Sequence, residues 1–268
     1  MTDVSEKKFG ILAYPAEHSL SPVMFRAAGL DYEVFEVGPD EFEAFVRDRD
    51  FDGLSVSLPY KERILPFLDE ASDDVEKIGA CNTVLKNEDG KLSGFNTDWI
   101  GAVEALEEVG VEISGKKVII LGAGGAARAI CYGLLQEGAD VVVLNRDLDE
   151  ARGIADDFGV EIGLLDPIEG RDCDVLIQAT SVWLTAGLDV KIVPDSFVQK
   201  LGERGGVVMD IVYKPLITPL LKIADEAGCK IVTGEKMLLN QALKQYEIWT
   251  GQDAPAEVMK NALENSLK

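Results

Sequence analysis

The chain has 268 residues, enough for one large or two ordinary domains, and its 47% hydrophobic and 28% charged residues are typical of a soluble globular protein. The formal net charge of −22 argues against nucleic acid or an anionic membrane as a partner. No apolar run approaches the roughly 18 residues of a membrane helix, and the N-terminus lacks the apolar core of a secretory signal. Because the four cysteines are dispersed and His18 is the single histidine, we expect no metal site and a reducing, cytoplasmic location.

The first hundred residues predict an α/β domain. Short apolar or alternating runs are typical of strands, and we expect strands at 9–14, 32–37, 52–59, 80–86 and 91–95. The Asp-Gly step just before residue 91 predicts a hairpin between the last two strands. Helices are expected at 39–49, up to about residue 68, at 71–78 and at 99–109.

Polar residues follow several of these predicted strands. Ser19 and Ser21 precede Pro22, so either serine could cap a helix that begins there. Lys61 follows the strand that ends at Pro59, and Asp98 directly precedes an apolar helical run. Taken alone, each of these residues has two possible roles. The serines could cap a helix or bind a ligand, the lysine could be a solvated surface charge or a catalytic group, and the aspartate could cap a helix or belong to a site.

From residue 116 onward strands and helices alternate regularly, which predicts a Rossmann-type domain with a parallel sheet. Strands are expected at 116–121, 139–144, 174–178, 206–210 and 229–233. The intervening helices are expected at 126–137, 149–158 and 218–227. Two further helices, at 237–250 and 256–267, are expected to return to the first domain.

The first strand of this second part leads into the pattern Gly122-x-Gly124-x-x-Ala127, which is typical of a dinucleotide-binding turn. Gly122 permits a tight turn, Gly124 lets the backbone approach a pyrophosphate, and Ala127 lets helix and strand pack closely. The free amides at the helix start would face the phosphates.

The choice of cofactor depends on the end of the next strand, about twenty residues beyond the glycines. An acidic residue there binds the ribose diol of NAD, whereas an arginine accommodates the 2′-phosphate of NADP. Asn145 and Arg146 therefore favour NADP. Asp147 and Glu150 would weaken phosphate binding, so NAD stays possible.

Several motifs in this order resemble the shikimate dehydrogenases over nearly the whole chain. They are Ser19-Leu-Ser21-Pro22, Val56-Ser57-Leu-Pro59-Tyr-Lys61, Gly79-Ala-Cys-Asn82-Thr83, Gly94-Phe-Asn96-Thr97-Asp98, the glycine turn, Asn145-Arg146, Asp210-Ile-Val-Tyr213-Lys-Pro215 and Met237-Leu-Leu-Asn-Gln241. The resemblance implies a substrate-binding and catalytic domain at 1–100 and 238–268, and an NADP-binding Rossmann-type domain at 101–237.

The resemblance also implies the reaction, a reversible NADPH-dependent reduction of 3-dehydroshikimate to shikimate in the pathway to aromatic amino acids. Lys61 and Asp98 would form the catalytic pair that handles the proton, and the protonation state of Lys61 stays open. The implied substrate-binding residues are Ser19, Ser21, Ser57, Lys61, Asn82, Asp98, Tyr213 and Gln241. The implied cofactor-binding residues are Gly122, Ala123, Gly124, Gly125, Ala126, Asn145, Arg146, Asp147, Ile211 and Gly234.

Three departures from the family pattern concern substrate affinity rather than reaction class. The family usually has Asn and Thr where this chain has Ser55 and Ser57, and a histidine where it has Phe25. Ser181 and Trp183 replace the usual Pro and Gly in a loop beside the nicotinamide.

Three alternative functions stay open at this point. One is a quinate/shikimate dehydrogenase of the same superfamily, with either NADP or NAD as its cofactor; another is a cofactor-binding sensor without turnover. The third is an unrelated dehydrogenase, such as one acting on a folate, which would leave Ser19 and Ser21 without a role. Oligomeric state is expected to be monomer or homodimer.

Overall fold

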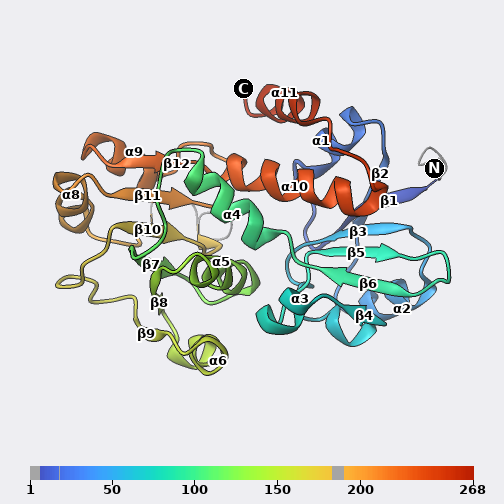
Figure 1. Cartoon of the computed structure of the whole chain (residues 1–268), viewed down its shortest axis with the longest axis horizontal. Coiled ribbons are helices and arrows are strands. Elements are labelled where there is room, and N and C mark those ends of the chain that lie inside the picture. The colour runs from blue at the N-terminus through green and yellow to red at the C-terminus, as the bar shows by residue number, and fades with distance from the viewer. Residues whose placement is uncertain (1–6, 18, 183–189) are drawn as a thin grey trace. The chain divides into compact units, whose positions relative to one another are not determined.

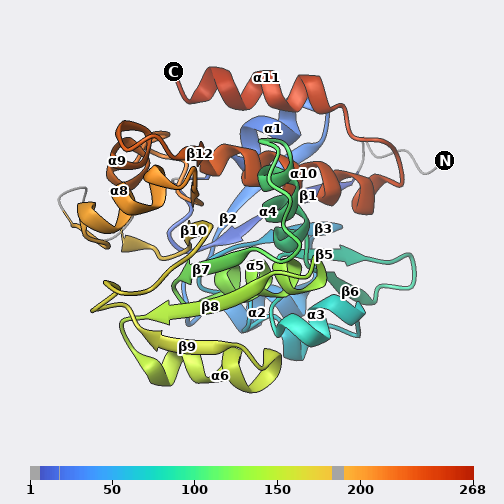
Figure 2. The ribbon, with the colours of Figure 1, turned by 60° about the vertical axis from the view of Figure 1, so that its left-hand side comes forward.

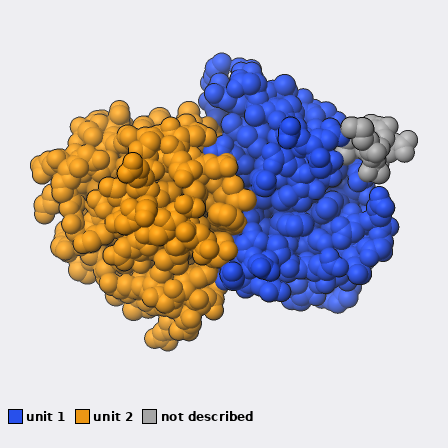
Figure 3. Space-filling model, viewed as in Figure 1, with its two compact units in different colours: residues 1–98, 239–268 blue, residues 99–238 orange. Residues whose placement is uncertain are grey.

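The computed structural model describes residues 7–17, 19–182 and 190–268, which form two compact units (Figure 3). Unit 1 comprises residues 1–98 and 239–268, and unit 2 comprises residues 99–238. The chain passes from one unit to the other at the start of α4 (Asp98–Glu107) and again within α10 (Gly234–Thr250). Each unit contains a six-stranded sheet.

The sheet of unit 1 is mixed, with the strand order β2-β1-β3-β5-β6-β4. Its strands are β1 (Lys8–Ala13), β2 (Asp31–Glu36), β3 (Gly53–Val56), β4 (Glu70–Ala71), β5 (Thr83–Lys86) and β6 (Leu92–Phe95). β1 runs parallel to β2 and β3, whereas β5 runs antiparallel to β3 and β6. The predicted hairpin between β5 and β6 is confirmed, and Gly90, at φ +81°, closes its turn by donating to the Asn87 carbonyl.

The core of unit 1 is rich in aromatic side chains. On one side Phe42 of α2 (Phe42–Asp48) stacks on Tyr60 with ring centroids 4.5 Å apart. Elsewhere Trp249 of α10 lies 5.0 Å from the ring of Phe25 in α1 (Ser21–Ala27). The last helix, α11 (Ala256–Ser266), packs along α1 (Figures 1 and 2). The C-terminal helices therefore do return to the N-terminal part of the chain, as predicted.

One expectation for this unit is wrong, and one strand was not predicted. The segment up to residue 68 forms a turn and the 3₁₀ helix η2 (Leu65–Phe67) rather than an α-helix, since Pro66 has no backbone N–H to continue one. The two-residue strand β4 was not predicted, because it is too short to show any alternation. The helix expected at 71–78 is α3 (Asp73–Ile78), and it ends at Gly79 in the left-handed region at φ +69°.

The sheet of unit 2 is entirely parallel, with the strand order β12-β11-β10-β7-β8-β9. Figure 2 shows β10, β7, β8 and β9 side by side. The strands are β7 (Lys117–Leu121), β8 (Asp140–Asn145), β9 (Glu161–Leu164), β10 (Val175–Gln178), β11 (Val207–Asp210) and β12 (Lys230–Val232). The described helices that lie wholly in this unit are α5 (Gly125–Gln136), α6 (Leu148–Phe158), α8 (Asp195–Glu203) and α9 (Pro219–Glu226), and most of α4 and the start of α10 belong to it as well. The predicted Rossmann-type parallel sheet is confirmed.

Alternate residues of these strands enter two different cores. Val118 and Ile120 of β7 pack with side chains of α4 and α5, whereas Ile119 and Leu121 pack with side chains of α8 and α9. Both faces of the sheet are thus covered, which explains why the strands read as continuous apolar runs. Among the described residues, no helix is long and apolar enough to cross a membrane.

Candidate functional site

Lys61 and Asp98 form an ion pair in unit 1. Lys61 lies in the turn after β3, and Asp98 is the first residue of α4. The Lys61 Nζ donates to Asp98 Oδ2 at 2.5 Å, and the two side chains are only 15% and 7% exposed. Because the pair is short and largely removed from water, its attraction is much stronger than that of a surface pair.

Asn82 holds the second carboxylate oxygen of Asp98. Its Nδ2 donates to Asp98 Oδ1 at 2.9 Å, while its Oδ1 accepts from the backbone N of Thr97 at 2.7 Å and from Thr83 Oγ1 at 2.8 Å. Since the amide is bonded through both its oxygen and its nitrogen, it has one favoured orientation. Asn82 Nδ2 also lies 3.4 Å from Gln241 Oε1 of α10. The structure thus brings four of the predicted site residues into one cluster.

The serine pair lies at the start of α1, but the expectation that Ser19 or Ser21 is the N-cap is wrong. The N-cap is Leu20, and Ser21 is already the first helical residue. Ser19 Oγ accepts from the Ser21 backbone N at 3.3 Å, which satisfies an amide at the helix start. The Ser21 side chain is buried and hydrogen-bonds the phenol of Tyr32.

Ser57 follows β3, at the carboxyl end of the strand, and the parallel strand β1 ends on the same side of the sheet. Its backbone N donates to the Leu12 carbonyl of β1 at 2.9 Å, so the segment after β3 begins beside β1. Because the carboxyl ends of parallel strands share one edge, this edge carries both serine-containing segments and Lys61.

Sequence reasoning missed three buried residues that reach the cluster, namely Tyr32, Thr83 and Gln245. The one signal was Ser55, noticed as a departure from the family pattern. Ser55 Oγ accepts from Tyr32 OH and donates to Gln245 Oε1, both at 2.7 Å. Asn96, in the predicted motif but not among the predicted site residues, accepts from the backbone N of Asp98 at 3.0 Å.

The glycine turn of unit 2 joins β7 to α5. Gly122 has φ +114°, and a Cβ there would lie 3.1 Å from the backbone of Ala179, so both the backbone conformation and the tight contact disfavour a side chain. A Cβ on Gly124 would meet no protein atom within 4 Å. Gly124 is also the N-cap of α5, and no side chain caps the first amides of the helix. These amides are therefore available to an anion.

Ile211 and Gly234 lie against one another in unit 2. A Cβ on Gly234 would lie 2.5 Å from the Ile211 carbonyl oxygen, so the start of α10 can approach the segment after β11 this closely only with glycine. Tyr213 belongs to unit 2 and lies in the segment between β11 and α9.

Asp210, the last residue of β11, holds the segment that carries Ile211 and Tyr213. Its Oδ1 accepts from the backbone N of Val212 at 3.0 Å, and its Oδ2 accepts from Thr218 Oγ1 at 2.7 Å. Burial raises the pKa of Asp210 to about 7, although these hydrogen bonds oppose the shift.

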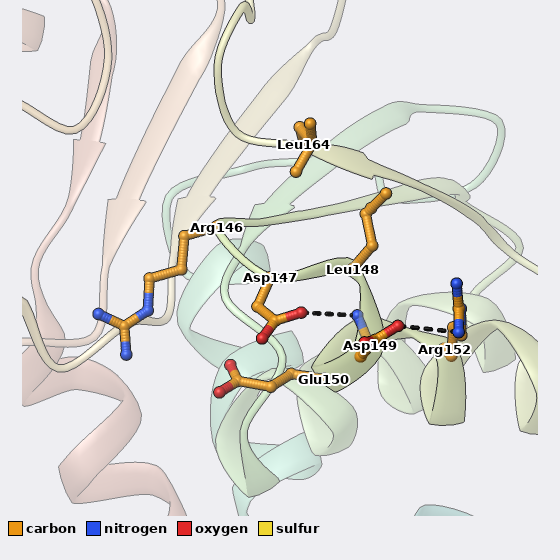
Figure 4. A pocket seen from close by; sticks show the side chains of 7 residues that line it. All are labelled: Arg146, Asp147, Leu148, Asp149, Glu150, Arg152 and Leu164. Carbon is orange, nitrogen blue, oxygen red and sulfur yellow. Dashed lines mark hydrogen bonds and ion pairs between the residues drawn. The ribbon is translucent and has the colours of Figure 1, made fainter.

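The end of β8 borders an open hollow of about 650 Å³ (Figure 4). Its lining residues are Arg146, Asp147, Leu148, Asp149, Glu150, Arg152 and Leu164. Arg146 extends away from the carboxylates of Asp147 and Glu150. Arg152, which sequence reasoning missed, pairs with Asp149 at 2.8 Å.

Asp147 and Glu150, the two acidic residues expected to weaken phosphate binding, both form hydrogen bonds within the turn after β8. Asp147 is the N-cap of α6, and its Oδ1 accepts from the backbone N of Asp149 at 2.8 Å. Asn145 Nδ2 donates to Glu150 Oε2 and to the Asp147 carbonyl, each at 2.9 Å. The two acids thus shape the turn that presents Arg146. Of the other residues considered, His18 and Trp183 lie outside the described residues.

Three segments of the chain match family models. Residues 11–84 match the shikimate dehydrogenase substrate binding domain, residues 104–190 match shikimate / quinate 5-dehydrogenase, and residues 234–264 match the shikimate 5′-dehydrogenase C-terminal domain.

Whole-chain comparisons agree with these matches. A shikimate dehydrogenase (NADP(+)) from Pyrococcus furiosus is 41% identical over 270 residues, covering 97% of this chain and 96% of that protein. The crystal structure of shikimate 5-dehydrogenase from Thermus thermophilus in complex with NADP(H) and shikimate is 35% identical, with a TM-score of 0.86 over 97% of this chain and 99% of that one. A shikimate 5-dehydrogenase from Listeria monocytogenes in complex with shikimate and NAD is 34% identical, with a TM-score of 0.83 over 96% of both chains. The chain therefore belongs to the shikimate dehydrogenase family.

Proposed function

We propose that this chain is an NADP-dependent shikimate dehydrogenase that interconverts shikimate and 3-dehydroshikimate. The observation that carries the proposal is the buried Lys61–Asp98 pair held by Asn82, in a unit whose residues 11–84 match the substrate binding domain of the family. Unit 1 would then bind the substrate, and unit 2, with its parallel sheet and glycine turn, would bind the cofactor.

Lys61 would handle the proton. In the direction of reduction, its ammonium polarises the ketone and supplies a proton to the oxygen, and in the reverse direction the neutral amine accepts that proton. Asp98 keeps the Lys61 amine at one position and offers its carboxylate to the same hydroxyl. The bound nicotinamide supplies or accepts the hydride.

The remaining polar residues would hold the substrate. Hydroxyls at Ser19 and Ser57 can donate to a carboxylate at the carboxyl ends of β1 and β3, without a buried counter-charge. Ser21, whose hydroxyl bonds the Tyr32 phenol, is assigned to the substrate by the family motif alone. Asn82 and Gln241, which lie within the cluster, would contact ring hydroxyls, and Tyr213 is assigned to the substrate by the family motif alone.

The glycine turn fits a pyrophosphate. The space over Gly124 is open, and the first amides of α5 have no side-chain cap. Ala123, Gly125 and Ala126 would contribute the neighbouring backbone, and Ile211 and Gly234 would border the nicotinamide. Arg146 would bind the 2′-phosphate of NADP, because Asp147 and Glu150 are engaged in the turn itself.

The test is reduction of NADP⁺ by the purified protein with shikimate and with quinate, followed side by side, and repeated with NAD⁺. We expect turnover with shikimate and a higher kcat/KM for NADP⁺ than for NAD⁺. Turnover of quinate at a comparable rate would place the protein among quinate/shikimate dehydrogenases. Binding of NADP⁺ without turnover of either acid would contradict the proposal.

A further inference from the structure

A line of buried side chains connects Tyr32 to Asn82 in unit 1. Tyr32 OH donates to Ser55 Oγ at 2.7 Å, and Ser55 Oγ donates to Gln245 Oε1 at 2.7 Å. Gln245 Nε2 then donates to the Asn82 carbonyl at 3.0 Å and to Thr83 Oγ1 at 2.9 Å. Each of these side chains belongs to a residue that is at most 4% exposed, so every broken link would leave a polar group without water.

The donors and acceptors in this line all point one way. Because Gln245 Nε2 donates to Thr83 Oγ1, the Thr83 hydroxyl hydrogen is directed elsewhere, and it reaches Asn82 Oδ1 at 2.8 Å. This bond favours the orientation in which Asn82 turns its Nδ2 toward Asp98. Gln245 therefore acts on the Asp98 carboxylate through two intervening side chains.

Ser55 and Gln245 complement each other in length. The serine hydroxyl donates to the Gln245 amide, and that amide reaches the backbone carbonyl of Asn82, the residue just before β5. Where the family usually has an asparagine on β3, this chain instead has a short residue there and a long amide from α10, 190 positions away in the sequence. Gln245 thus brings an amide to a position on β3 where this chain has only a hydroxyl.

We propose that Ser55 and Gln245 are positioning residues for the reaction, which hold Asn82 and thereby the Asp98 carboxylate in the orientation that Lys61 requires. The inference rests on the proposed function of the Lys61–Asp98 pair. Neither residue needs to touch the substrate, so their removal affects kcat far more than the KM for shikimate.

The test compares Gln245→Met, which keeps the length and loses the amide, with Ser55→Ala and Ser55→Thr. We expect Gln245→Met and Ser55→Ala each to lower kcat roughly 10-fold, with the KM for shikimate within about two-fold of wild type. Ser55→Thr, unlike Ser55→Ala, keeps a hydroxyl at this position, so we expect its kcat to stay near that of wild type. The double variant, Ser55→Ala with Gln245→Met, loses little more than either single variant, because both break the same line.

Val46→Ala is the control for a general loss of stability. It removes two buried methyl groups from α2, at a residue that takes no part in the line from Tyr32 to Asn82. All variants are compared at a temperature well below their unfolding midpoints. A normal kcat in Gln245→Met, or a 10-fold loss also in Val46→Ala, would overturn the inference. Wild-type protein that turns over neither shikimate nor quinate would instead contradict the proposed function.

Discussion

Lys61 and Asp98 are 37 residues apart in the sequence and meet because a turn after β3 and the first turn of α4 project toward the same point. Asn82 donates to the carboxylate and is itself held by the Thr97 backbone, so both oxygens of Asp98 have a fixed partner. This preorganisation is what a proton-transferring pair requires, since its groups need not rearrange during the reaction.

Substitution of Lys61 tests this pair directly. We expect Lys61→Ala to lower kcat by about 10²- to 10⁴-fold with little change in the KM for shikimate, because the proposed proton donor is lost while the hydroxyls and amides proposed to bind the substrate stay. The matched control is Lys86→Ala, which removes another partly buried lysine of unit 1 from its pairing with Asp52 at 3.7 Å. Activity that survives in Lys61→Ala would rule out its assigned role.

The buried carboxyl of Asp210 makes the stability of the protein depend on pH. In the native state it keeps its proton up to about pH 7, whereas in the unfolded chain it loses the proton near its ordinary pKa of 3.8. Between these values the native state binds more protons than the unfolded state, so the free energy of unfolding falls as pH rises. The slope from this one group is at most about 1.4 kcal/mol per pH unit.

The measurement is urea unfolding of wild type and Asp210→Asn from pH 4.5 to 8.5. We expect wild type to lose stability relative to the variant as pH rises toward 7, and the difference to level off above pH 8. The subtraction removes the titration of every other acidic group. A difference that does not change with pH would show that Asp210 is charged throughout.

Among the elements, the turn between β7 and α5 shows how two glycines of one motif differ. Gly122→Ala places a Cβ against the Ala179 backbone at a positive φ, so we expect a lower unfolding temperature as well as weaker NADP⁺ binding. Gly124→Ala enters open space, so we expect unchanged stability but an NADP⁺ dissociation constant at least about 10-fold higher, since the methyl group occupies the place of the pyrophosphate. Isothermal titration and thermal unfolding of both variants provide the check, and equal NADP⁺ affinity in Gly124→Ala and wild type would place the phosphates elsewhere.

The elements that could be predicted are those whose pattern is local. The strands of unit 2 are β-branched runs buried on both faces, and the turn after β7 carries its glycines in sequence order. β9 and α8 were not predicted; β9 is a short edge strand that contains Gly163 and the half-exposed Leu164, so it shows no apolar run.

The site could be predicted only in part. Family resemblance indicated Lys61 and Asp98, because their motifs are short and contiguous. The roles of Ser55 and Gln245 could not be predicted, because the hydrogen bond between them joins β3 to α10 and depends on the tertiary fold. The same holds for Asp147. From the sequence its carboxylate is expected to weaken binding of the cofactor phosphate, whereas in the structure it caps α6.

At the scale of the whole molecule, the dominant feature is the charge of −22, from 48 acidic and 26 basic residues. Many of the ion pairs in the described part of the chain are exposed, such as Lys191–Asp195 and Lys244–Glu247, and exposed pairs stabilise a fold only weakly. The surplus carboxylates therefore repel one another in the compact state more than in the expanded, unfolded chain.

Screening this repulsion is expected to stabilise the protein. The Debye length falls from about 30 Å at 0.01 M salt to about 3 Å at 1 M, so added salt removes the long-range repulsion before it affects the buried Lys61–Asp98 pair. We expect the thermal midpoint to rise steadily with KCl over this range, and to rise equally with NaCl if screening is the cause. A larger rise with one cation at equal ionic strength would indicate specific ion binding instead, and a fall with both would show that attractive ion pairs outweigh the repulsion among the acidic groups.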